Sequence, residues 1–135
     1  MTLYGQEHVD RYRETDGEEG HDWENGSSTL LLTTTGRKSG EERTHPLIYG
    51  RDGDAYLIVA SKGGADASPA WYLNLEADPE VEVQVWGDRF KARARTATSE
   101  ERQRLWPIMT GEWPAYDQYQ TKTDREIPVV ILERA

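Results

Sequence analysis

A glycine-bounded loop with basic side chains is the segment of this sequence best suited to bind an anion. Its core is Gly36-Arg37-Lys38-Ser39-Gly40, and Arg43 and Thr44 follow shortly after it. Glycine adopts positive φ angles readily, so several backbone N–H groups of such a loop can point at one spot. Arginine can bind a phosphate through two hydrogen bonds, and the hydroxyl groups add donors. Taken alone, the pattern fits an exposed basic hairpin loop as well as a phosphate site.

A second candidate is the run Ala60-Ser61-Lys62-Gly63-Gly64, where a buried strand emerges into a pair of glycines. Small residues at a strand end let a flat ring lie against the backbone, and Lys62 can reach the anionic edge of such a ring. Two pairs of side chains spaced three residues apart on a helix face complete the set: Trp71 with Asn74, and Tyr116 with Tyr119. Tyrosines can line a pocket and donate a proton, although packing in a core is their more frequent role.

Several common kinds of site are absent from the sequence. It contains no cysteine, which excludes disulfides and thiolate nucleophiles. Gly36 and Gly40 enclose only three residues and no Gly-Lys-Ser/Thr ending follows them, so the loop is not a P-loop, and no Gly-x-Gly-x-x-Gly run opens a helix. The three histidines lack metal-ligand spacing, and no serine occupies a nucleophile elbow. We therefore expect no metal site.

The charge distribution favours a small anionic ligand over nucleic acid or lipid. The net charge is −9, which opposes nonspecific binding to polyanions. Residues 1–24 carry eight acids and two bases, whereas residues 33–62 carry five bases and four acids. The apolar runs are far shorter than the roughly 20 residues of a membrane-spanning helix, and no secretory signal pattern opens the chain. We expect a cytoplasmic protein whose contact with the inner membrane face is at most peripheral.

These residues are expected to lie on one small domain. Residues 1–27 read as an acidic, mobile arm with too little apolar surface to pack firmly, and residues 28–135 read as the folded body. Apolar alternation and turn signals predict strands at residues 29–35, 43–51, 55–61, 81–86, 90–96 and 127–132. Helices are expected after Ser68-Pro69 and after the capping box at residues 98–101. About six antiparallel strands with two short helices indicate a mainly β (α+β) fold, namely a small barrel.

The motifs occur together in the order and spacing of one family. They are the runs at residues 33–40, 43–44, 46–47, 58–64, 69–75, 116–120, 123–125 and 127–129. Over about residues 28–133 the chain resembles the deazaflavin-dependent nitroreductases and quinone reductases of actinobacteria. The resemblance implies a split β-barrel of the FMN-binding type that binds coenzyme F420, an 8-hydroxy-5-deazaflavin, instead of FMN.

The resemblance also implies roles for individual residues. The phosphate and the start of the polyglutamate tail would be held by Arg37, Lys38, Ser39, Gly40 and Arg43. The deazaflavin ring would be bordered by Pro46, Ala60, Ser61, Lys62 and Gly63, with Trp71 and Asn74 nearby. The catalytic set would be Tyr116, Tyr119 and Ser61. Reduced F420 would transfer hydride to a quinone or nitroaromatic acceptor, and a tyrosine or a water molecule would then protonate the product.

Two alternatives stay open at this point. An FMN-dependent split-barrel reductase would be yellow as purified, and a noncatalytic F420 carrier would bind F420 without turnover. The pair Tyr116 and Tyr119 favours an enzyme. Because barrels of this type often pair, a homodimer is a further expectation.

Overall fold

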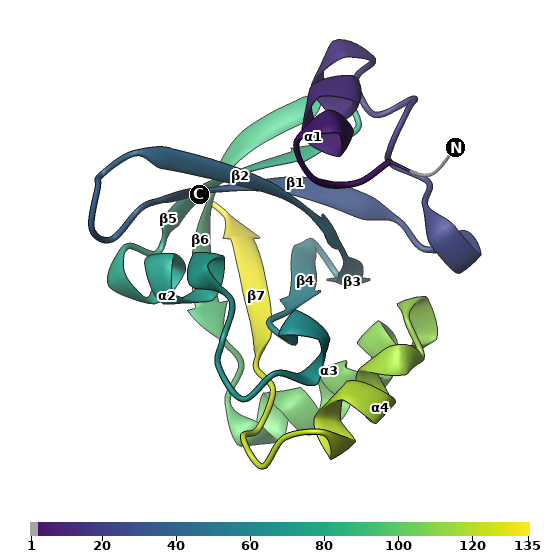
Figure 1. Cartoon of the computed structure of the whole chain (residues 1–135), viewed down its shortest axis with the longest axis vertical. Coiled ribbons are helices and arrows are strands. Elements are labelled where there is room, and N and C mark those ends of the chain that lie inside the picture. Colours follow the sequence, from purple (N-terminus) through teal and green to yellow (C-terminus); the bar gives the residue numbers. More distant parts are fainter. Residues whose placement is uncertain (1–2) are drawn as a thin grey trace.

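The computed structural model describes residues 3–135. In chain order its elements are α1 (Gly5–Glu14), the 3₁₀ turn η1 (Glu24–Gly26), β1 (Thr29–Thr35), β2 (Glu42–Ile48), β3 (Gly50–Asp52), β4 (Ala55–Val59), the 3₁₀ turn η2 (Lys62–Gly64), α2 (Ala70–Ala77), β5 (Glu80–Val85), β6 (Asp88–Thr96), α3 (Ser99–Glu112), α4 (Ala115–Thr121) and β7 (Val129–Arg134). The strands form one antiparallel sheet, while α3 and α4 lie together at one end of it (Figure 1).

The order of the strands explains why the sheet curls. The order is β2-β1-β5-β6-β7-β4-β3, so β2 and β3 lie at opposite ends of the sheet. Only Tyr49 separates these two strands in the chain. The two edges must therefore meet at Tyr49, and the natural twist of the sheet allows this closure. Past that junction β2 and β4 are not paired, and a seam is left between them.

The mainly β barrel expected from the sequence is confirmed, and residues 3–135 form seven strands and four α-helices in place of about six and two. The predicted strand at residues 43–51 is divided at Tyr49 into β2 and β3. Residues 113–124 are aromatic and polar with mixed signals, and no element was predicted there; they contain α4. The capping box is confirmed, since Thr98 Oγ1 accepts from Glu101 N and a carboxylate oxygen of Glu101 accepts from Thr98 N.

Among the described residues, two large apolar clusters hold the sheet together with α2, α3 and α4. Successive residues of a strand face opposite sides, so β4 contributes to both clusters. Ile58 lies in the cluster inside the barrel, and Leu57 lies in the cluster beneath α3 and α4, with Leu105 and Met109. All four side chains are completely buried. Each such side chain stabilises the fold by about 1.5–3 kcal/mol.

The N-terminal segment packs more firmly than the sequence analysis expected. Val9 and Tyr12 of α1 are buried against Leu31. The hydroxyl of Tyr12 donates to the carbonyl of Thr29 at 3.0 Å and accepts from the backbone N–H of Trp86 at 2.9 Å. The expectation of too little packing surface is therefore wrong, because two large side chains and these hydrogen bonds suffice. The boundary at residue 28 stays a prediction. Within residues 3–135, no helix is both long and apolar enough to cross a membrane.

Candidate functional site

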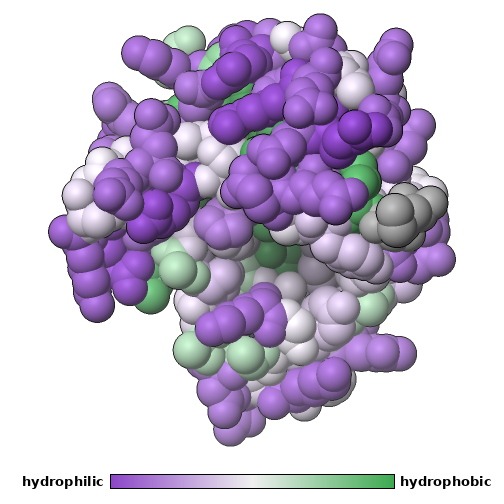
Figure 2. All heavy atoms as spheres, turned by 45° about the horizontal axis from the view of Figure 1, so that its top comes forward, coloured by the Kyte–Doolittle hydropathy of each residue, from purple (hydrophilic) through white to green (hydrophobic). Residues whose placement is uncertain are grey.

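A cavity of about 660 Å³ opens in the seam between β2 and the end of β4. Its walls come from the second half of β2, from residues 59–63, from the start of α2, from residues 113–119 and from the N-terminal segment. Figure 2 shows a hollow on this side of the molecule with hydrophobic atoms at its floor. The volume falls within the roughly 300–1,000 Å³ typical of pockets for organic ligands and cofactors.

The backbone after β4 turns sharply at the wall of the cavity. Lys62, Gly63 and Gly64 all have positive φ, at 47°, 65° and 87°. This turn presents Ser61, Lys62 and Gly63 to the cavity. Gly64 faces α4 instead, where a Cβ atom would lie 2.6 Å from the carbonyl oxygen of Tyr119. The turn and α4 are therefore packed backbone against backbone.

Arg125 holds the same turn from behind. Its Nε donates to the carbonyl of Ala65 at 2.8 Å, and its Nη2 donates to the carbonyls of Ser61 at 2.9 Å and Ala60 at 3.2 Å. Ala60 is completely buried and does not line the cavity. Among residues 3–135, Arg125 forms no ion pair with a carboxylate. In the sequence Arg125 stands out only as part of the motif at residues 123–125, because its contacts lie at least 60 residues away along the chain.

Aromatic side chains form a further part of the cavity wall. Both predicted tyrosines, Tyr116 and Tyr119, line the cavity together with Trp71 and Trp113. Trp113 Nε1 donates to the hydroxyl of Tyr119 at 3.3 Å. Burial raises the pKa of Tyr116 above its ordinary value, so this phenol keeps its proton. The wall can therefore hold a flat molecule and offers phenol groups beside it.

The N-terminal segment closes one end of the cavity. Tyr4, His8 and Trp23 all contribute to the lining. The ring of Trp23 stacks on that of Trp113, with centroids 5.7 Å apart, and Tyr4 packs edge-on against Trp23. These residues were not predicted from the sequence, because isolated aromatic side chains in a polar segment show no periodicity.

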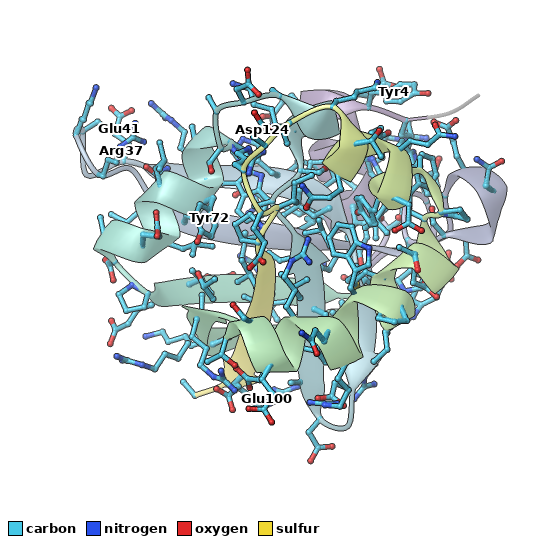
Figure 3. The ribbon with its side chains drawn as sticks, turned by 90° about the horizontal axis from the view of Figure 1, so that it is seen from below. Tyr4, Arg37, Glu41, Tyr72, Glu100 and Asp124 are labelled. Atoms are coloured by element: carbon cyan, nitrogen blue, oxygen red, sulfur yellow. The ribbon has the colours of Figure 1, made fainter. Side chains whose placement is uncertain are left out.

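The basic loop lies beyond the other end of the cavity and is anchored to it. None of Arg37, Lys38, Ser39, Gly40 and Arg43 lines the cavity. The backbone N–H and the guanidinium of Arg37 both donate to Asn74 Oδ1, at 3.2 and 3.0 Å. Asn74 lies one turn of α2 beyond Trp71, which does line the cavity. In Figure 3 Arg37 and Glu41 lie together at one side of the molecule and Tyr4 at the other.

The backbone of the loop at residues 36–40 differs in one respect from the expectation that both glycines have positive φ angles. Gly40 has a φ of 73°, but Gly36 does not have a positive φ. Gly36 is needed for space instead, since a Cβ there would lie 2.7 Å from Ser39 Oγ. Arg43 pairs with Glu41 at 3.0 Å, and both side chains are mostly exposed. An incoming anion can displace the carboxylate of Glu41 from Arg43 at little cost in free energy, because an exposed ion pair contributes only about 0–1 kcal/mol.

Fold and site together define a small barrel protein whose seam cavity has the size of a pocket for an organic ligand. A model of the F420H(2)-dependent quinone reductase family matches residues 4–134. The chain belongs to this family, as the resemblance in the sequence implied.

Individual relatives agree with this assignment. The chain is 48% identical over 126 residues to the F420H(2)-dependent quinone reductase Rv1261c of Mycobacterium tuberculosis, covering 91% of this chain and 85% of that protein. It is 42% identical over 104 residues to the putative F420H(2)-dependent quinone reductase Rv3178 of the same organism, covering 77% and 87%.

Solved structures show the same split-barrel type. The F420-H2 dependent reductase FDR-A superposes with a TM-score of 0.73 at 44% identity, covering 78% of this chain and 93% of its own. A structure described as a domain-swapped dimer superposes with a TM-score of 0.75 at 40% identity, covering 95% and 96%. The expected split β-barrel is thereby confirmed.

Proposed function

We propose that this protein oxidises reduced F420 and reduces a quinone within the seam cavity. The observation that carries the proposal is that a small-residue turn and a set of aromatic side chains line one and the same cavity. The turn suits the ring of a cofactor, and the wall suits a flat acceptor beside it. The family to which the chain belongs supports both the cofactor and the acceptor class.

The turn leaves room for a flat ring. Gly63 lines the cavity, and apart from Gly63 and its two chain neighbours no described residue has an atom within 4 Å of the position that a Cβ would take there. A ring can therefore approach the backbone directly. Lys62 and Pro46 also contribute to the lining, so a cation and a flat apolar side chain are available to it. When bound, a deazaflavin supplies two-electron hydride transfer, and the protein supplies position, shielding and charge.

We assign the residues by their places around the cavity. The ring would contact Pro46, Ser61, Lys62, Gly63 and Trp71, with Ala60 supporting them from behind. The phosphate would be held beyond α2 by Arg37, Lys38, Ser39, Gly40 and Arg43. Asn74 would act by holding Arg37 in place. The acceptor would lie against Tyr116 and Tyr119. Nitroaromatic compounds are a second acceptor class, since their flat rings suit the same wall.

Binding and turnover measured side by side test the proposal. The purified protein is titrated with F420 and with FMN, and oxidation of reduced F420 is followed with a panel of soluble quinones and nitroaromatics. We expect F420 to bind more tightly than FMN, with quinones supporting turnover. Tighter binding of FMN would favour the flavin alternative. Binding of F420 without turnover on any acceptor would favour the carrier.

Charge removal from the basic loop should weaken cofactor binding. Lys38→Ala and Arg43→Ala are each expected to raise the dissociation constant of F420 about tenfold, since a hydrogen bond to a charged group contributes about 1.5–3 kcal/mol. The effect should shrink at high ionic strength. Arg89→Ala is the matched control, because Arg89 is an exposed arginine of β6 paired with Glu82 and does not line the cavity. Unchanged affinity in both loop variants would refute the phosphate assignment.

The two tyrosines should differ as proton donors. Tyr119→Phe is expected to lower the turnover rate about tenfold while leaving F420 affinity unchanged, since general acid catalysis contributes at least this much. Tyr116→Phe should have a smaller effect, because burial raises the pKa of Tyr116 and makes it a weaker acid. Steady-state kinetics with one quinone would compare the variants. A larger loss in Tyr116→Phe would reverse the assignment.

A further inference from the structure

His45 is a titratable residue in the wall of the cavity. It lies on β2 between Arg43 and Pro46 and lines the cavity. Residues two apart on a strand share a face, so His45 is on the face of Leu47. Leu47 packs against the cluster inside the barrel, which contains Trp71. His45 is therefore on the inner face of the seam.

Its hydrogen bonding sets His45 apart from the other two histidines. Nε2 of His8 bonds to the carbonyl of Gly20 at 2.8 Å. Both ring nitrogens of His21 are used, by Asp22 at 2.9 Å and by Tyr49 at 2.8 Å. Within residues 3–135, Nδ1 of His45 is enclosed and has no partner. Nε2 of His45 is not enclosed in this way, so it is the nitrogen open to a ligand.

The surroundings of His45 favour a neutral ring with its proton on Nε2. Burial and the nearby guanidinium of Arg43 both lower the pKa of His45 below its ordinary value. The imidazole is then neutral at pH 7 and carries one proton. A buried N–H group without an acceptor is rarer in proteins than a buried acceptor atom without a donor. The enclosed Nδ1 is therefore the nitrogen without a proton, and Nε2 carries the proton and acts as a donor.

We propose that His45 is a cofactor-binding residue that donates Nε2–H to an oxygen of the polyol chain joining the deazaflavin ring to its phosphate. The inference rests on the function proposed above. On β2, His45 shares a face with Arg43, which is assigned to the phosphate, and it lines the cavity together with Pro46, which is assigned to the ring. A neutral donor at this place suits a hydroxyl oxygen, whereas the phosphate is served by the cations of the loop.

Three variants test whether the donor itself matters. In His45→Gln the amide nitrogen can reach the place of Nε2, in His45→Asn it stops near the place of Nδ1, and His45→Leu has no donor. We expect the dissociation constant of F420, measured by fluorescence titration, to rise about tenfold in His45→Leu and His45→Asn. It should stay within about threefold of the wild type in His45→Gln. Melting temperatures measured without cofactor control for folding.

The outcomes separate this inference from the function on which it rests. Wild-type affinity in His45→Leu would overturn it, and so would an equal loss in the leucine and glutamine variants. A change confined to the quinone KM would place His45 at the acceptor and also overturn it. If the wild type itself fails to bind F420, the proposed function fails. The tautomer is tested without any cofactor, by ¹⁵N NMR of the ring at pH 7, and a proton on Nδ1 would overturn the inference.

Discussion

Gly64→Ala is expected to lower the free energy of unfolding by about 3 kcal/mol and to weaken F420 binding. A Cβ at this position would lie 2.6 Å from the carbonyl oxygen and 3.0 Å from the Cα of Tyr119. Both are backbone atoms of α4, so the helix or the turn must move. A non-glycine residue in the left-handed region costs about 1–2 kcal/mol, and overpacking adds about 1–3 kcal/mol. Moving either element displaces Tyr119 or Ser61 from the cavity.

A second glycine, Gly53, separates the cost of the left-handed backbone from the cost of overpacking. Gly53, in the turn between β3 and β4, also has a positive φ, but a Cβ there would meet no described atom within 4 Å. Gly53→Ala should therefore lose only the backbone part, about 1 kcal/mol, and should keep full affinity for F420. Urea denaturation and F420 titration give the two readouts. Equal losses of stability in the two variants would contradict the close packing of the turn on α4.

Arg125→Leu is expected to destabilise the protein by about 3 kcal/mol or more and to raise the dissociation constant of F420 more than tenfold. Three carbonyl groups, those of Ala60, Ser61 and Ala65, would lose their donor. A polar group left unsatisfied in a buried place costs about 1–3 kcal/mol. The turn that borders the cavity would then lose its shape, so stability and affinity should fall together.

Arg125→Lys should show an intermediate loss of stability and of F420 affinity. The ammonium of Arg125→Lys keeps the charge but cannot reproduce the planar fork that reaches three carbonyls, so an intermediate loss is expected. Arg104→Leu is the control, since Arg104 forms an exposed ion pair with Asp52 and should cost under about 1 kcal/mol. F420 affinity in Arg104→Leu should not change. A retained affinity in Arg125→Leu would show that the turn keeps its shape without the guanidinium.

Local signals predicted the strands and the capping box well. The alternation at residues 81–86 matches β5, and Gly53 and Asp54 form the turn between β3 and β4. The break at Tyr49 was not predicted, because it follows from the closure of the sheet and not from local propensity. α4 was missed for a similar reason. Tyr116 and Tyr119 were recognised as a pair three residues apart, but Pro114 and the polar residues around them obscured the helix.

The candidate site was predicted in part. Pro46, Ser61, Lys62, Gly63 and Trp71 were named from the resemblance, and all of them line one cavity with both predicted tyrosines. The sequence could not reveal what Arg125 and His45 do, because these roles depend on a carbonyl or a nitrogen facing a particular direction. The N-terminal lining residues were missed because the packing of α1 depends on the two hydrogen bonds of Tyr12.

The position of Pro46 has a consequence for the behaviour of the molecule in concentrated solution. β2 ends the strand order, so one side of it is free of a neighbouring strand. Such edges invite strands of other molecules to add to the sheet, which is a common start of aggregation. Proline offers no N–H to an incoming strand and is tolerated at sheet edges for that reason. The residue beside the cavity thus also helps to keep copies of this protein from polymerising through their edges.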